Sequence, residues 1–351
     1  MMLCSQFRSL RSIAAGVLAL ALAASALAGP AAARITRGPA ATAHCVGSDL
    51  LAEIARDSPE AHARVLAAAR ETENDGAILW RIERVGLAPS YLFGTIHVTD
   101  SRVTAFSPET ERILGTVDRV ALEIADLSPA AATPVMQKAA GMLVFTDGQR
   151  LDKLLSKDEY EKVKGILSGV GVPGAVASLV KPWFVSMVLS VSDCERKKAE
   201  SGGMVVDSKI AEMARARGIE VIGLETIEGQ LTALASIPLG EQVAGLKSAL
   251  RLADRAHDMM ETTLQMYIQR RMGAAMPLQR ELARRAGVEK VDFEGFEREL
   301  IEKRNRVMRD GVLGLLEKGN ALVAVGALHL VGRNGLVAML REAGYTLTPI
   351  E

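Results

Sequence analysis

Two histidines occupy the same place in two copies of a short pattern, Gly-x-x-His, near opposite ends of this 351-residue chain. Gly94 and His97 belong to the segment YLFGTIH, and Gly326 and His329 belong to the segment ALVAVGALH. Each segment is apolar enough to form a buried strand, and its glycine permits a tight turn or a close approach of the backbone to a ligand. We therefore expect each copy to present one imidazole just beyond a strand end. Because the chain has five histidines, two in equivalent places favour a chemical role over packing.

Two glutamates follow short apolar segments in the same manner. Glu123 ends the segment RVALE, and Glu225 ends the segment IEVIGLE. The carboxyl ends of parallel strands meet at one edge of an open α/β sheet, where ligands bind, so we expect these glutamates and the two histidines to gather there. Two imidazoles with one or two carboxylates match the ligands of Zn, Mn, Fe or Co, and an open position on such an ion would activate water. The alternatives are hydrogen-bonded structural histidines, and glutamates that cap a helix or lie on the surface.

A basic segment on the helix before the second histidine pattern supplies further candidates. It contains Arg304, Asn305 and Arg306. A basic run on a helix usually faces solvent, but asparagine is unfavourable inside a helix, which indicates that Asn305 is kept for a contact. Arg304 and Asn305 are both candidates to stabilise the negative charge that develops on an oxygen during hydrolysis. His62 and His257 lie in polar, charged segments and are interpreted as solvent-facing.

The elements that must position these residues are predicted from apolar periodicity. Two alternating segments joined by a short turn predict an N-terminal hairpin whose second strand delivers His97. The strands and helices that follow predict an α/β fold with a mostly parallel central sheet and flanking helices. The helical middle of the chain is interpreted as a cap insertion over the sheet, because no linker-like run separates it. The predicted strands are 78–85, 90–96, 119–124, 219–226, one ending at His329, and 345–350, and the later helical patterns are 241–272, 277–286 and 293–317.

The first 28 residues have the pattern of a secretory signal peptide. Arg8 and Arg11 precede an apolar run rich in Ala and Leu, and Ala26-Leu27-Ala28 forms an A-x-A-like cleavage site. The protein is therefore predicted to be periplasmic or secreted, with no membrane span after removal of the signal. The predicted layout is a signal peptide at 1–28, a flexible N-terminus at 29–42, and a single domain at 43–351 with helical insertions at about 127–203 and 227–318.

The composition bears on two questions: whether the chain binds nucleic acid, and whether its cysteines form a disulfide. The 42 Lys+Arg equal the 42 Asp+Glu, and the predicted signal holds two arginines and no acid, so the exported chain has a small negative charge. The sequence has no basic patch of the kind that would predict nucleic-acid binding. Two of the three cysteines, Cys45 and Cys194, remain after signal removal. An isolated pair in an oxidising compartment usually forms a disulfide, which we predict here; two unrelated buried thiols are the alternative.

In the segments that hold the two histidines, the two glutamates and Arg304, the chain resembles the TraB/PrgY/GumN family, which includes the TIKI ectoenzymes. It looks most like the exported GumN-like branch. The resemblance implies a fold related to erythromycin esterase and the haem-binding ChaN proteins. It also implies divalent-metal-dependent hydrolysis of peptide bonds, with roles that fall on His97, His329 and Glu123 and with Glu225 and Asn305 as further matches. The sequence contains no His-Glu-x-x-His motif, so a zincin mechanism does not apply. The matching segments are YLFGTIH at 91–97, ALE at 121–123, GLET at 223–226, RNRVM at 304–308, and VGALH at 325–329 followed by AGY at 343–345.

The leading hypothesis is therefore an exported metal-dependent hydrolase that acts on a peptide or protein. A divalent ion (Mn, Co, Zn or Fe) at His97, His329 and Glu123 would polarise the scissile carbonyl and activate water, and Glu123 or Glu225 would accept the water proton. The alternative hypotheses are a non-catalytic protein that binds haem, a metal or a glycan, and an accessory factor in exopolysaccharide production. The sequence leaves open the substrate, the identity of the metal and the oligomeric state.

Overall fold

The computed structural model describes residues 45–288 and 293–351. The predicted signal peptide at 1–28 and the predicted flexible segment at 29–42 lie outside the described residues. Within the described part, no helix is both long enough and apolar enough to cross a membrane.

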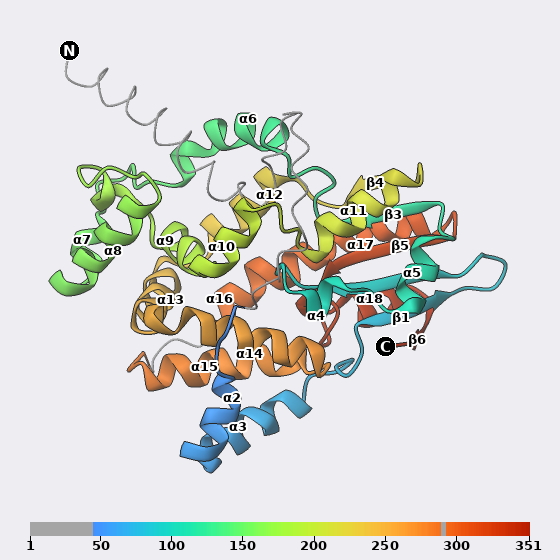
Figure 1. The fold of residues 1–351 in the computed structure, drawn as a ribbon, viewed down its shortest axis with the longest axis horizontal. Helices are drawn as coiled ribbons and strands as arrows, with labels where there is room; N and C mark the ends of the chain where they lie inside the picture. The colour runs from blue at the N-terminus through green and yellow to red at the C-terminus, as the bar shows by residue number, and fades with distance from the viewer. Residues whose placement is uncertain (1–44, 289–292) are drawn as a thin grey trace, which may run out of the picture.

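A six-stranded sheet runs through the described part of the chain, in the order β4-β3-β5-β2-β1-β6 (Figure 1). The first four strands in that order are parallel to one another, and β1 is antiparallel to both β2 and β6. The α/β class, the mostly parallel sheet and the hairpin of β1 and β2 are thus confirmed. The strands are β1 (Leu79–Glu83), β2 (Ser90–Thr95), β3 (Arg119–Leu122), β4 (Glu220–Gly223), β5 (Ala321–Gly326) and β6 (Thr346–Pro349).

Helices cover the sheet and extend the molecule to the left of it in Figure 1. Among the described residues, the α-helices are α2 (Leu50–Asp57), α3 (Pro59–Arg70), α4 (Ser101–Thr104), α5 (Pro108–Leu114), α6 (Pro129–Ala139), α7 (Leu151–Leu154), α8 (Lys157–Gly169), α9 (Pro182–Leu189), α10 (Asp193–Glu200), α11 (Val206–Ala216), α12 (Ile227–Ser236), α13 (Leu239–Arg251), α14 (Ala256–Ile268), α15 (Ala275–Arg285), α16 (Glu294–Glu297), α17 (Lys303–Leu316) and α18 (Leu336–Glu342). Short 3-10 segments are η1 (Ala140–Met142), η2 (Ala177–Leu179), η3 (Ala253–Arg255), η4 (Met272–Ala274) and η6 (Ala327–His329), and η5 (Arg298–Glu302) is π-helical.

The sheet is buried on both faces, because successive side chains of a strand point to opposite faces and helices cover each one. On one face Phe93 and Leu322 belong to a hydrophobic cluster with residues of α5, α11 and α14. On the other face Leu92 and Val323 belong to a cluster with residues of α17 and α18. This double burial explains why the strands are continuous apolar runs in the sequence.

A third hydrophobic cluster lies within the helical part of the chain and contains residues of α6 to α9, α12 and α13. These helices fall in the two predicted insertions, although the division into one domain with insertions stays a prediction. The single long helix expected at 241–272 is wrong, because the chain leaves the helix at residues 252–255. The break lets α13 pack against α9 in the third cluster while α14 contributes to the first.

The disulfide between Cys45 and Cys194 is present, with Cα atoms 5.8 Å apart. It joins the segment before α2 to the start of α10, across a sequence separation of 149 residues. A bridge over a loop of this length stabilises a fold by about 4 to 5 kcal/mol through its constraint on the unfolded chain.

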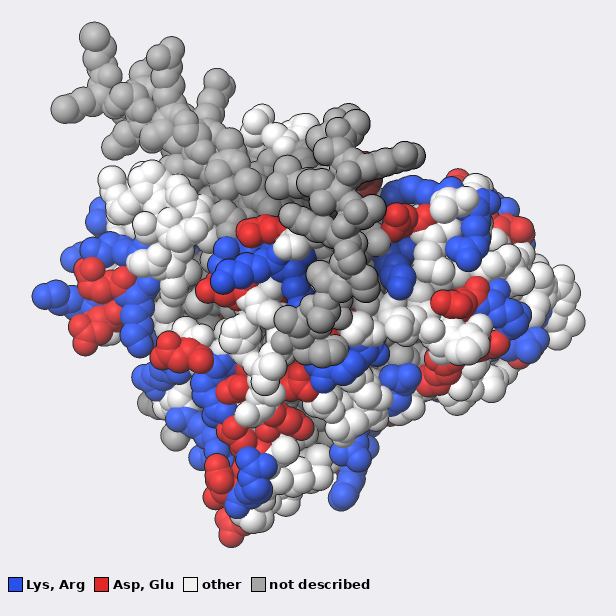
Figure 2. Space-filling view, viewed as in Figure 1, with Lys and Arg blue, Asp and Glu red and all other residues white. Residues whose placement is uncertain are grey.

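Charged side chains of both signs are mixed on the surface. On the face that Figure 2 shows, Lys and Arg side chains of the described residues lie among Asp and Glu side chains. Some charged side chains of the described residues pair within one helix, such as Arg112 with Glu109 and Arg196 with Asp193. Exposed pairs of this kind add little stability, so the fold depends mainly on its buried clusters.

Candidate active site

The four residues expected at the sheet edge follow the four parallel strands. Glu225, Glu123, His329 and His97 lie one to three residues beyond the ends of β4, β3, β5 and β2, which are adjacent in the sheet in that order. Strands β2 and β5 pair in parallel register as far as their last residues, so the two Gly-x-x-His patterns lie side by side. The carboxyl edge of the sheet brings the four side chains together.

Gly326 lies at the centre of this group. Its N–H donates to Glu123 Oε1 at 2.7 Å. A Cβ placed on Gly326 would lie 3.1 Å from the same oxygen, 3.5 Å from His329 Cδ2 and 4.0 Å from His97 Nε2. Both imidazoles and one carboxylate oxygen therefore border the same small space. His329 Nε2 is 3.7 Å from Glu123 Oε1, close to the roughly 3.5 Å between two ligands of a tetrahedral ion with bonds of about 2.0–2.2 Å.

Gly94 has a separate structural role. A Cβ at this position would lie 3.0 Å from Ala327 Cβ and 3.1 Å from Ala327 Cα, so the glycine lets η6 pack directly on β2. Its carbonyl oxygen accepts a hydrogen bond from the Tyr267 hydroxyl at 2.7 Å. Neither Gly94 nor Gly326 has a positive φ. Close approach, rather than a left-handed turn, is the reason for glycine at both positions.

His97 is held by a carboxylate from α11. Its Nδ1 lies 2.9 Å from Asp207 Oδ2, and the Thr95 hydroxyl donates to Asp207 Oδ1 at 2.8 Å. An ionised carboxylate can only accept, so Nδ1 carries a proton in either charge state of the ring. The charge of Asp207 raises the pKa of His97 to about 9, so at pH 7 Nε2 also carries a proton, which a bound ion would displace. Because 62% of the His97 side chain is exposed, water screens part of this attraction.

His329 is held by an amide instead. Its Nδ1 lies 2.6 Å from Asn305 Oδ1, and Asn305 Nδ2 donates to the carbonyl oxygen of Asn334 at 2.6 Å. That carbonyl can only accept, which fixes the orientation of the amide and makes Nδ1–H of His329 the donor. Burial lowers the pKa of His329 to about 4, so the ring is neutral at pH 7. Both ends of the buried Asn305 side chain are occupied, so Asn305 positions His329 and is not placed to bind an oxyanion.

Arg304 joins the two glutamates. Its Nη2 donates to Glu123 Oε2 and to Glu225 Oε2, both at 2.7 Å, and its Nε donates to both oxygens of Glu225 at 3.1 Å. Gln230 Nε2 donates to Glu123 Oε2 at 3.0 Å and to Glu225 Oε2 at 3.3 Å. The Arg304 side chain is 15% exposed, so the interpretation of the basic run as solvent-facing is wrong for Arg304. It holds for the exposed Arg306.

Glu123 is ionised despite its burial. Burial alone would raise its pKa, but the positive charges of His329, Arg304 and His97 and the N–H of Gly326 bring the pKa down to about 2. His329 is itself charged only at acid pH. Near neutrality, Arg304 at 2.7 Å is therefore the charge on which the ionised state of Glu123 mainly depends.

Glu225 does not cap a helix. The Thr226 side chain caps α12 by accepting the N–H of Gly229. The Glu225 carboxylate, 5% exposed, faces Arg304 instead. The helix-capping alternative for Glu225 is therefore wrong.

Three members of this network were not predicted from the sequence: Asp207, Gln230 and Asn334. Asp207 lies in the first turn of α11, where an acid is ordinarily interpreted as compensating the helix dipole. Asn334 contributes a backbone carbonyl, which no residue type reveals. The π-helical segment η5 directly precedes α17, the helix of Arg304 and Asn305. Such segments are frequent at functional sites, but apolar periodicity does not locate them.

The donor set fits a divalent ion in its chemistry. Both histidines have Nδ1 held by an acceptor, the usual arrangement of metal-ligating imidazoles, and Glu123 supplies an anionic oxygen beside them. As the side chains stand in residues 45–288 and 293–351, no three His, Cys, Asp or Glu are arranged to hold an ion. Binding would thus require these side chains to move, and the His97 ring is the most exposed of the three.

Comparison with known proteins gives a family. The profile of the TraB/PrgY/gumN family matches residues 78–349. The chain is similar to metalloprotease TIKI2 of Danio rerio (24% identity over 316 residues, 77% of this chain and 60% of the relative) and to metalloprotease TIKI1 of the same species (26% over 317 residues, 77% and 62%). It is also similar to the uncharacterized protein YbaP of Escherichia coli (strain K12), with 25% identity over 253 residues, 72% of this chain and 87% of the relative. The matched region thus spans about 60% of the length of the TIKI relatives. No solved structure matches the chain at a significant level.

Proposed function

This chain belongs to the TraB/PrgY/gumN family, and on that premise we propose that it is an exported metal-dependent hydrolase that cleaves peptide bonds in a peptide or protein. The relatives named metalloprotease TIKI1 and TIKI2 support the reaction class. One observation carries the proposal: both His97 and His329 have Nδ1 held by an acceptor, and both border the same space as Glu123. The disulfide supports an oxidising compartment, periplasmic or extracellular.

In this proposal His97, His329 and Glu123 hold the ion. The acceptors at Nδ1 orient both imidazoles to bind the ion through Nε2, from which His97 would first lose a proton, and Arg304 keeps Glu123 ionised. When bound there, a divalent ion would act as a Lewis acid toward the scissile carbonyl and would lower the pKa of water.

Glu225 is the proposed proton acceptor. Its Oε1 accepts one hydrogen bond, from Arg304 Nε at 3.1 Å, and a carboxylate oxygen has room for another donor. Glu123 is bound at both oxygens and has a low pKa, so it suits a ligand better than a base. Arg304 Nη1 donates to the Leu300 carbonyl at 3.4 Å, so each nitrogen of the guanidinium is engaged. We therefore assign Arg304 to neutralising the two carboxylates rather than to binding the oxyanion.

A non-catalytic binding protein is the second candidate, and one observation favours it. Arg304 and Gln230 engage both Glu123 and Glu225. These bonds hold both carboxylates in place around a cation, as a binding site requires, and neither carboxylate has to exchange a proton in that role.

The test combines metal loading with peptide cleavage. The purified exported chain would be loaded with Mn²⁺, Co²⁺ or Zn²⁺ in turn and incubated with a peptide library, with products identified by mass spectrometry. Wild type and His62→Ala, a control in α3, should cleave in the presence of metal. His97→Ala should bind metal more weakly and lose cleavage, and Glu225→Gln should keep metal while the rate falls by roughly two to four orders of magnitude. Stoichiometric metal binding without cleavage of any peptide would instead support the binding protein.

A further inference from the structure

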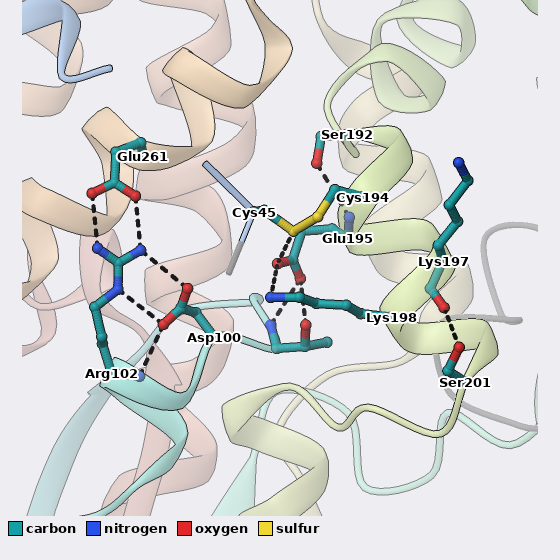
Figure 3. Close-up of a disulfide and its surroundings, with 11 residues drawn as sticks. Cys45, Asp100, Arg102, Ser192, Cys194, Glu195, Lys197, Lys198, Ser201 and Glu261 are labelled. Carbon is teal, nitrogen blue, oxygen red and sulfur yellow. Dashed lines mark hydrogen bonds and ion pairs between the residues drawn. A yellow bond between two sulfur atoms is a disulfide. The ribbon is translucent and has the colours of Figure 1, made fainter. Parts of the chain in front are cut away.

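The loop that follows β2 and carries His97 is fixed to two other elements by buried carboxylates. Glu195 of α10 accepts the Thr99 N–H at 2.8 Å and the Thr99 hydroxyl at 2.9 Å. One residue later, Asp100 accepts Arg102 Nε at 3.0 Å, and Arg102 Nη2 donates to Glu261 of α14 at 2.7 Å. Figure 3 shows Glu195 on one side of this loop and the Arg102–Glu261 pair on the other. The loop is therefore held between α10 and α14.

The disulfide connects these two supports covalently. Cys194 directly precedes Glu195, and Cys45 Sγ lies 3.6 Å from Glu195 Oε1 (Figure 3). The segment after Cys45 is bound to α14, because the Ser48 N–H donates to an Asp258 carboxylate oxygen at 2.7 Å. The loop and the two helices are thus linked in a ring. The segment of Cys45 joins α14 to α10 through the disulfide, Glu195 joins α10 to the loop, and Arg102 joins the loop back to α14.

Within the part of the chain that the structure describes, helix α10 buries few of its own side chains. Of its eight residues, Glu195 and Ala199 are buried, and the rest of the helix is mostly charged. Burial of a carboxylate costs free energy unless hydrogen bonds satisfy it. Glu195, 5% exposed, finds those bonds in the N–H and the hydroxyl of Thr99, and Lys198 Nζ lies 4.0 Å from its Oε1. An anchor with so little apolar burial around it depends on the covalent bridge beside it.

We propose that Glu195 and the Cys45–Cys194 disulfide are positioning residues, which set the place of the His97 ring through Thr99. The ring is 62% exposed and is otherwise held by Asp207, so the course of the loop decides how closely Nε2 approaches the other donors. Loss of either residue frees the loop while the sheet stays intact. The consequence for metal binding rests on the proposed function, whereas the consequence for the loop does not.

The experiment measures the loop and the metal separately, on the full exported chain. Three variants are compared with wild type: Cys45→Ser with Cys194→Ser, Glu195→Gln with the bridge intact, and Ser201→Ala, an exposed control at the end of α10. Hydrogen exchange followed by mass spectrometry, without metal, reports on peptides that cover residues 97–105 and on peptides of β5. Titration with Co²⁺ alone reports on the site.

The first two variants should exchange at least about tenfold faster at 97–105, with β5 unchanged, and should bind Co²⁺ about 10- to 100-fold more weakly. Ser201→Ala should match wild type in both measurements. Exchange that is unchanged at 97–105, or that rises equally in β5, overturns the proposal even if the melting temperature falls. If wild type binds no Co²⁺, the proposed function fails and the exchange data alone decide whether the loop is positioned in this way.

Discussion

Replacement of Arg304 by methionine tests the electrostatics of the site. The substitution keeps an unbranched side chain of similar length but removes the charge that faces Glu123 and Glu225, whose side chains are 9% and 5% exposed. Removal of one partner from a buried ion pair typically costs 3 to 5 kcal/mol, about the cost of an unpaired buried charge. The net shift of the Glu123 pKa from 4.5 to about 2, to which His329, Arg304, His97 and the Gly326 N–H all contribute, corresponds to about 3 kcal/mol, since one pKa unit is about 1.4 kcal/mol.

The sign of the pH dependence is the more specific part of this prediction. In wild type the folded pKa of Glu123 lies below its unfolded value, so its contribution is complete above about pH 4.5 and is lost as the pH falls toward 2. Without Arg304, a main charge that offsets the burial of Glu123 is gone, and we expect its folded pKa to rise above 4.5. Arg304→Met should therefore become more stable between pH 7 and pH 5, where this group leaves wild type unchanged.

Thermal melts at pH 7, 6 and 5 would measure both effects. At pH 7 the melting temperature of Arg304→Met should lie roughly 6 to 15 °C below wild type, and the gap should narrow at pH 5. Arg306→Met, two residues away on α17 and exposed, is the matched control and should change the melting temperature little at any pH. Addition of Glu123→Gln and Glu225→Gln to Arg304→Met should recover stability. Equal behaviour of Arg304→Met and Arg306→Met would refute the buried-charge argument.

Other substitutions test the geometry around the two histidines. Gly326→Ala should abolish Co²⁺ binding measured by calorimetry, because its Cβ would enter the space that the donors share; Gly314→Ala, whose Cβ meets nothing within 4 Å, should bind normally. Asp207→Asn should weaken Co²⁺ binding about 10- to 100-fold and lower the pKa of its histidine from about 9, which NMR of the ring nitrogens measures; an unchanged pKa would exclude Asp207 as the main charge. Asn305→Ala leaves a buried imidazole N–H without its acceptor and should cost about 1 to 3 kcal/mol in denaturant melts, whereas an unchanged midpoint would show that the bond is dispensable.

The positions of the two histidines and two glutamates at strand ends could be predicted from the sequence, because they follow from local rules. Apolar runs that end in a polar residue specify a strand and its carboxyl end, and parallel pairing then brings those ends to one edge. Asn305 was found for a related reason, since an asparagine inside a helix is locally unfavourable and so indicates a contact.

The hydrogen-bond partners of these histidines and glutamates could not be predicted, because each hydrogen bond joins segments that are far apart in the chain. Asp207 is 110 residues from His97, and Arg304 is 181 residues from Glu123. Local patterns assign an acid in a first helical turn to the helix dipole and a basic run to solvent. Only the tertiary fold shows that both serve the site. The break between α13 and α14 also depends on the tertiary fold. The two halves of one helical pattern pack into different hydrophobic clusters, α13 in the third and α14 in the first.

X-ray absorption at the zinc edge, on protein loaded with one equivalent of Zn²⁺, tests most directly whether one ion binds to His97, His329 and Glu123 together. The wild-type spectrum should contain two imidazole ligands at about 2.0–2.1 Å and carboxylate oxygen at about 2.0–2.2 Å. His97→Ala and His329→Ala should each lose one imidazole, and Glu123→Ala should lose the carboxylate. A wild-type spectrum with one imidazole or none, or spectra that do not change in these variants, would contradict the shared site.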